Sequence, residues 1–385
     1  MHARDQSTPI VVTAALATVS CVFPGLAAGA LAVQASDDFG VAEGTYGWAL
    51  GIFFLCASVA SVPMGLLAQR LGPQRQLTVA LVLTASVQVI IAVAARDFAF
   101  MLMMLGLAGV LNSAVQTAVN LALSRAELPR LGLAMATKQS AMPASAMLGG
   151  LAVPAVALTV GWRWAYAMGA GVALVALALV RRFISGGVVA ARTSRSWDVV
   201  ASPRSAILGM AGVSMLLAFT AGSINAWTVS SGVDAGLSEG VAGLALSLAA
   251  GLGICVRLLS GVMLDRSARL PLASAVAVMA FGTAGFVLLT LRMPATHLVG
   301  TVLAFAGGWI WPVFTNFSIV NANPEGAGAA SGVTQMGVYV GVFLAPVLTG
   351  QIIERASYSV MWTVVAAIGT LGAVMLGMLA PQFPR

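Results

Sequence analysis

The sequence predicts an all-α membrane protein with twelve transmembrane helices arranged as two parallel six-helix repeats. Of its 385 residues, 59% are hydrophobic and only 8% are charged, and the mean hydropathy is +0.97. A soluble protein of this length carries about three times as much charge. Apolar stretches of about 20 residues recur along the chain, each long enough to cross the ~30 Å hydrocarbon core of a bilayer. The third observation is an internal repeat at a constant spacing.

Charged residues and clusters of Gly, Pro and Asp separate the apolar stretches from one another. The expected spans are 10–35, 46–68, 77–95, 99–123, 132–158, 162–183, 205–230, 241–263, 271–291, 296–320, 328–352 and 358–380. The longest connection is polar and rich in arginine. We therefore expect an N-terminal bundle over 1–183, a linker over 184–204 that lies in the cytoplasm, and a C-terminal bundle over 205–385.

The internal repeat relates the two bundles by an ungapped offset of 196 residues, seen first between 37–50 and 233–246. Pairs that share the offset include Asp38–Asp234, Glu43–Glu239, Gly65–Gly261, Arg70–Arg266, Asn120–Asn316 and Gln139–Gln335. Such a constant offset indicates a duplicated six-helix unit. Because six is even, both copies have the same orientation in the membrane. The first apolar run is therefore expected to be a retained helix and not a signal peptide.

Arginine is distributed unevenly between the two sides of the predicted bundle. The termini and the connections after even-numbered spans carry Arg4, Arg70, Arg75, Arg125, Arg130, Arg181, Arg182, Arg192, Arg195, Arg204, Arg266, Arg269 and Arg385. The opposite side carries Arg96, Arg163, Arg292 and Arg355. The positive-inside rule places both termini in the cytoplasm. The composition favours a bacterium, so the expected location is its cytoplasmic membrane. Since the basic residues are dispersed between apolar segments, they predict no nucleic-acid partner.

Two loops carry a recognisable motif, "GLLAQRLGPQR" at 65–75 and "GVMLDRSAR" at 261–269. They resemble the G-x-x-x-D-R-x-G-R-[RK] signature of the major facilitator superfamily, and with six-plus-six helices the resemblance covers nearly the whole chain. It implies that family's fold and secondary transport by alternating access. It also implies a gate built from Gly65, Arg70, Arg75, Gly261, Asp265, Arg266 and Arg269.

The physical logic of the motif is local. A glycine lets two helices approach closely, and an Asp–Arg pair ties a short turn to a neighbouring helix end. Gln69 replaces the aspartate in the first copy, which predicts a weaker latch there. The alternative is that these arginines only determine topology.

Two cations lie within the predicted spans and away from their ends, Lys138 in span five and Arg257 in span eight, at a depth of ~10 Å. Every Asp and Glu lies in a terminus, a loop or a helix end. In the resembled family, spans five and eight face each other, so the two cations would flank a central cavity. Cations without acidic partners are costly in hydrocarbon, which favours an anion clamp. The alternatives are that Lys138 snorkels to the surface or that Arg257 belongs to the gate.

Polar amides supply further candidates. Asn112, Gln116 and Asn120 recur every four residues, so they share one helical face, and span four lines the cavity in the resembled family. The alternative is that they join neighbouring helices. Gln139, Asn225 and Asn316 complete the predicted set of substrate contacts.

The acidic residues that repeat before spans two and eight are Asp38, Glu43, Asp234 and Glu239. We expect them to cap helix starts, with proton handling as the alternative.

The sequence offers no basis for an enzyme. The two histidines, His2 and His297, lie at a terminus and near a helix end, and no catalytic, metal or cofactor cluster is expected. In the resembled family, drug-exporting branches often carry a Gly-Pro pair in span five, and many proton-coupled members carry an arginine in span four. Both features are missing here, which disfavours a proton-driven drug exporter. We therefore expect a secondary transporter of a small organic anion, such as a carboxylate, by proton symport or exchange. The runner-up is efflux of drug-like or secondary-metabolite compounds. The expected partners are this anion, protons and the lipid bilayer, with the protein a monomer.

Overall fold

The computed structural model describes residues 3–126, 131–184, 201–266, 272–323 and 327–383, and this part of the chain is almost entirely helical, without a strand. The first half contains α1 (Ala3–Ala30), α2 (Ala32–Phe39), α3 (Glu43–Tyr46), α4 (Trp48–Leu71), α5 (Pro73–Ala94), α6 (Phe98–Arg125), α7 (Leu131–Gln139), α8 (Ala141–Ala152) and α9 (Arg163–Phe183). The second contains α10 (Arg204–Asp234), α11 (Glu239–Arg266), α12 (Leu272–Leu289), α13 (Pro294–Gly308), α14 (Trp311–Ala322), α15 (Ala327–Arg355) and α16 (Tyr358–Leu379).

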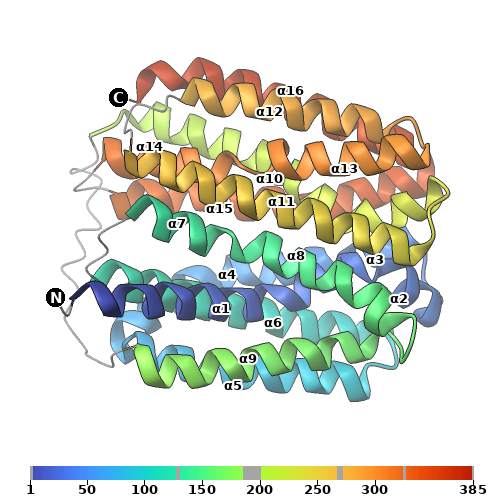
Figure 1. Cartoon of the computed structure of the whole chain (residues 1–385), viewed down its shortest axis with the longest axis horizontal. Coiled ribbons are helices and arrows are strands. Elements are labelled where there is room, and N and C mark those ends of the chain that lie inside the picture. The colour runs from blue at the N-terminus through green and yellow to red at the C-terminus, as the bar shows by residue number, and fades with distance from the viewer. Residues whose placement is uncertain (1–2, 127–130, 185–200, 267–271, 324–326, 384–385) are drawn as a thin grey trace.

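The helices run side by side in one bundle, and both chain ends lie at the same end of it (Figure 1). The start of α7 also lies there, whereas α2 and α3 lie at the other end. We call these the termini end and the far end. Eleven of the described segments are long and apolar enough to cross a membrane. The ninth predicted span corresponds to α12, whose described apolar part, Ala275–Leu289, is shorter.

Local chemistry explains several helix boundaries. The Asp97 carboxylate accepts a hydrogen bond from the Phe100 N–H (2.8 Å) and so caps the start of α6. Proline at the first position of α5 costs nothing, because that N–H has no helical partner. Gly40 ends α2 with a φ of 64°, a left-handed conformation that glycine adopts without strain.

Three predicted spans are divided between two helices: span one changes from α1 to α2 at Leu31, near its end, whereas spans five and ten are broken nearer their middle. Span five consists of α7 and α8, and Pro143 follows the break. Span ten consists of α13 and α14, and Pro312 lies just after the break. Proline has no N–H and cannot complete the helical ladder, so each break leaves carbonyl groups without their usual donors.

The two halves repeat the same packing. In the first half α1 contacts α6, α8 and α9, and α5 contacts α9. In the second half the equivalent α10 contacts α13, α15 and α16, and α12 contacts α16. The halves meet where α4 packs on α15, where α11 packs on α7 and α8, and where α1 packs on α10. The chain thus folds as two similar bundles joined along one seam.

Glycines let α11 pack closely against span five near both ends of α11. A Cβ added to Gly150 would lie 2.5 Å from the Gly243 carbonyl oxygen and from Ser247 Oγ, too near for a real contact. A Cβ on Gly261 would lie 2.5 Å from the Ala136 Cβ. The absence of side chains at these positions lets the two halves close against each other.

Candidate functional site

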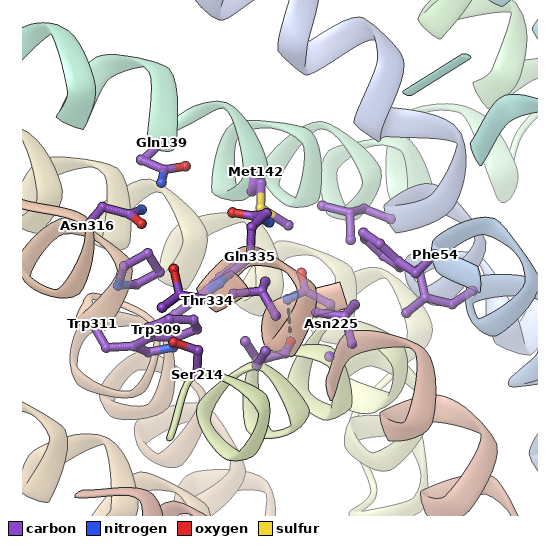
Figure 2. Close-up of a pocket in the computed structure, with 18 residues that line it drawn as sticks. Phe54, Gln139, Met142, Ser214, Asn225, Trp309, Trp311, Asn316, Thr334 and Gln335 are labelled. Atoms are coloured by element: carbon purple, nitrogen blue, oxygen red, sulfur yellow. Dashed lines mark hydrogen bonds between the residues drawn. The ribbon is translucent and has the colours of Figure 1, made fainter. Parts of the chain in front are cut away.

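A cavity of about 60 Å³ lies at the seam between the halves, with walls contributed by both (Figure 2). Its polar lining residues are Gln139, Ser214, Asn225, Asn316, Thr334 and Gln335. Trp309 and Trp311 supply aromatic surface at the break of span ten, and the remaining lining residues are apolar. None of the residues that line the cavity carries a charge.

The structure brings three of the predicted contacts together in this cavity, namely Gln139, Asn225 and Asn316. Sequence reasoning did not single out Ser214, Thr334 and Gln335 as site residues. A usable signal existed for one of them, because Gln139 and Gln335 are repeat partners and both line the cavity. Thr334 and Ser214 carry no comparable signal.

Two polar atoms of the lining residues are buried without a partner among the described residues. Asn225 donates from Nδ2 to the Ala221 carbonyl (2.6 Å), and its Oδ1 accepts nothing. The Trp311 indole N–H also has no acceptor. A buried polar group without a partner costs free energy, so these two lining residues hold one acceptor and one donor that a ligand or water reaching them would satisfy.

The amide stripe of α6 does not line this cavity. Asn112 is buried and its Oδ1 lies 3.2 Å from the Cys21 Sγ of α1, a contact within the first half. Gln116 is partly buried, and Asn120 is exposed. Asn112 therefore contributes to packing between α1 and α6 in this structure, while a substrate contact for the three residues stays a prediction.

Lys138 lies in the last turn of α7 and is partly exposed, next to the cavity residue Gln139. In the described part of the chain its ammonium makes no hydrogen bond and no ion pair. It is close enough to the Cys21 thiol for an electrostatic interaction. The Tyr339 side chain of α15 forms a hydrogen bond with the cavity residue Gln335.

Arg257 is almost completely buried, with 3% of its surface exposed, and it lies behind the cavity wall. Its guanidinium donates to the Gln139 carbonyl (3.1 Å) and to the Trp309 carbonyl. The same group lies 4.8 Å from the centre of the Trp309 ring, a cation–π contact. With its donors occupied in this way, Arg257 faces backbone atoms and not the cavity, and contact with a substrate stays untested.

The termini end is closed by a contact between α11 and α7. The Asp265 carboxylate accepts hydrogen bonds from the N–H groups of Gly132 (2.7 Å) and Leu133 (2.9 Å). These are among the first N–H groups of α7, which have no helical partners and form the positive end of the helix dipole. Asp265 of the second half therefore caps a helix of the first half.

The structure gives less support for a gate role of the other predicted residues. At Gly65 a Cβ would lie 3.8 Å from Thr117 Cγ2, an ordinary distance, so close helix approach does not explain this glycine. Arg70, Arg75 and Arg266 are exposed. Arg269 lies outside the described residues.

The far end is closed by hydrogen bonds to carboxylates of both halves. Gln34 donates to Glu239 (2.6 Å) and Tyr358 donates to Glu43, and each bond crosses the seam. Asp38 instead pairs with Arg163 (2.6 Å) within the first half, and Asp234 with Arg292 (2.7 Å) within the second.

The expected capping role of these four repeated acids is wrong as stated. The residue before α3 is Ala42, which has no capping side chain, and Ser238 accepts from the Val241 N–H at the start of α11. Glu43 and Glu239 lie in first turns, where the helix dipole favours a carboxylate. Their side chains, however, bond to the opposite half.

A family model described as "Major Facilitator Superfamily" matches this chain over residues 12–346. A comparison with curated proteins finds no match. The match includes both motif loops, the cavity residues and most of the helices, and the helical bundle agrees with it, so the predicted fold class is confirmed. The chain belongs to the major facilitator superfamily.

Proposed function

We propose that this secondary transporter moves a small organic anion, such as a carboxylate, across a bacterial cytoplasmic membrane by alternating access. Secondary transport by a multi-pass membrane protein follows from the family. The choice of an anion, the coupling and the location are our proposal. They rest on the charges and the polar groups around the cavity.

The observation that carries the proposal is the isolated ammonium of Lys138. It is the only lysine in the chain, it lies inside a membrane-spanning segment, and no described acidic residue pairs with it. A charge at such a position is costly unless water or a counter-ion compensates it. A bound anion would supply that compensation and would form charge-assisted hydrogen bonds with the ammonium.

The polar lining of the cavity supports a small, polar cargo over a large apolar one. Gln139 and Gln335 offer amide donors from both halves, and the unpaired Trp311 N–H is a further donor for a carboxylate oxygen. A cavity of about 60 Å³ suits a small cargo in the closed arrangement. The efflux alternative would favour a larger apolar chamber.

Proton symport is the coupling that we favour. A proton carried with a monovalent anion makes the transported pair neutral, so the membrane potential does not oppose its uptake. The excess of arginine at the termini end supports a cytoplasmic position for both termini.

A panel of ligands tests the proposal. Purified protein is heated with small carboxylates and, as matched controls, with the corresponding neutral amides. Ligands that bind the native state raise Tm. We expect carboxylates to raise Tm and amides to leave it unchanged, and proteoliposomes to take up the stabilising carboxylate faster with an inward proton gradient. Stabilisation by neutral or cationic apolar compounds alone would instead support efflux.

A further inference from the structure

Arg257 is a buried guanidinium without an acidic partner. It lies within α11, and no described carboxylate pairs with it. Burying a charge costs several kcal/mol unless its donors are satisfied. The groups that satisfy them therefore indicate what this arginine does.

Its two acceptors are carbonyls at helix breaks. Gln139 is the last residue of α7, and Trp309 directly follows the last residue of α13. Unpaired carbonyls at the C-terminal end of a helix carry partial negative charge, and a cation there is stabilising. One planar guanidinium can donate to both because it presents several N–H groups in a rigid fork.

Each of these two carbonyls lacks its usual helical donor, and each lies close to a proline. In a regular helix the Gln139 carbonyl would accept from residue 143, but Pro143 has no N–H. The Trp309 carbonyl would accept from Val313, but the Val313 N–H bonds to the Ile310 carbonyl (3.1 Å), just after Pro312. The sequence thus opens two positions in the backbone ladder, and Arg257 fills both.

The bridge crosses the seam between the halves. Gln139 belongs to the first half, whereas Arg257 and Trp309 belong to the second. The side chains of Gln139 and Trp309 both line the cavity. We propose that Arg257 is a positioning residue that holds the two broken helices together, and so couples the cavity walls to closure of the termini end.

This inference rests on movement of the halves, which is part of the proposed function, but not on the nature of the cargo. Arg257 is nearer to the Arg266 end of α11 than to its Glu239 end, on the same side of the bundle as the Asp265 contact. When the termini end opens, α7 must leave α11 and the bond to the Gln139 carbonyl must break. Trp309 can remain bound, since it moves with Arg257.

The test uses two variants that weaken the bridge by different chemistry. In Arg257→Lys a single ammonium keeps the charge but cannot reproduce the fork. In Pro143→Ala the arginine is untouched, and the new N–H competes for the Gln139 carbonyl. Because a hydrogen bond to a charged group is worth about a factor of ten or more, we expect Arg257→Lys to raise the open-to-closed ratio at the termini end roughly tenfold. Pro143→Ala should shift it in the same direction.

The readout is the distance between spin labels on ligand-free protein whose native cysteines are replaced. One pair, at the exposed Met135 and Met263, spans the termini end, and another, at the exposed Ala42 and Arg355, spans the far end. We expect both variants to lengthen the distance only for the first pair. Pro63→Ala removes another helix-interior proline, in α4, and should change neither distance.

Unchanged distances at the termini end in both bridge variants would overturn the inference. A change in Arg257→Lys that Pro143→Ala does not share would also overturn it, because the effect would then not pass through the Gln139 carbonyl. No anion is present in this experiment, so its result is independent of whether carboxylates are the cargo.

Discussion

Replacing Asp265 by alanine removes a carboxylate that caps α7 from the opposite half. The N–H groups of Gly132 and Leu133, which lie 2.7 and 2.9 Å from the carboxylate oxygens, lose their acceptor. Water can replace it only when the halves separate. The variant should therefore favour opening at the termini end. Asp265→Asn should act in the same direction more weakly, because it keeps one acceptor oxygen but loses the charge.

The expected size follows from the geometry. Loss of an N-terminal cap costs about 0.5–2 kcal/mol, and the charge contributes about 0.3–1 kcal/mol of that in the field of the helix dipole. Asp265 is exposed, so water screens part of the interaction. We expect Asp265→Ala to destabilise the closed termini end by about 1–2 kcal/mol, which is a shift of about five- to thirtyfold in the open-to-closed ratio.

A cysteine at Asn316, a cavity position, reports the opening by its rate of reaction with a thiol reagent. The native cysteines are replaced first. We expect Asp265→Ala to raise the rate of this thiol reaction by the same factor as it raises the open-to-closed ratio at the termini end. Asp97→Ala is the matched control, because Asp97 caps α6 within one half. An unchanged rate in Asp265→Ala, or an equal rise in the control, would refute the claim that Asp265 holds the termini end closed.

Three further substitutions probe the far end. Gly150→Val places a side chain where α8 meets Gly243, so we expect the far end to stay open, measured by reagent access from that side. Tyr358→Phe removes the donor to Glu43 and should raise the same access several-fold, whereas no change would show that this bond does not contribute to closure. Thr45→Ala breaks a bond between exposed groups, to Glu354, and should change access by less than a factor of about two.

Much of the fold was predictable from the sequence because membrane spans are set by length and hydropathy. The predicted ranges match the observed helices closely, apart from the breaks within spans one, five and ten. Pro143 indicated the first break in principle, but proline within a membrane helix does not always interrupt it, as Pro63 in α4 shows. Pro312 lies just after the break at Trp309, and the same uncertainty applies there.

The site was only partly predictable. Helical periodicity placed Asn112, Gln116 and Asn120 on one face, but the rotation of that helix against its neighbours decides whether the face meets a cavity. Arg257 was recognised as a costly charge, yet its partners are backbone carbonyls, which sequence patterns do not reveal. The repeat was the better guide, since it pairs Gln139 with Gln335 across the cavity.

The central claim is that Lys138 binds an anion, and the affinity of the stabilising carboxylate for purified variants tests it most directly. At constant salt concentration, we expect Lys138→Gln to raise Kd by at least about thirtyfold, since losing one partner of a buried charged contact costs ~2–5 kcal/mol. Lys138→Arg should retain part of the affinity. Arg163→Gln, which removes a positive charge at the far end, is the control and should bind normally. An unchanged Kd in a folded Lys138→Gln protein would contradict the account.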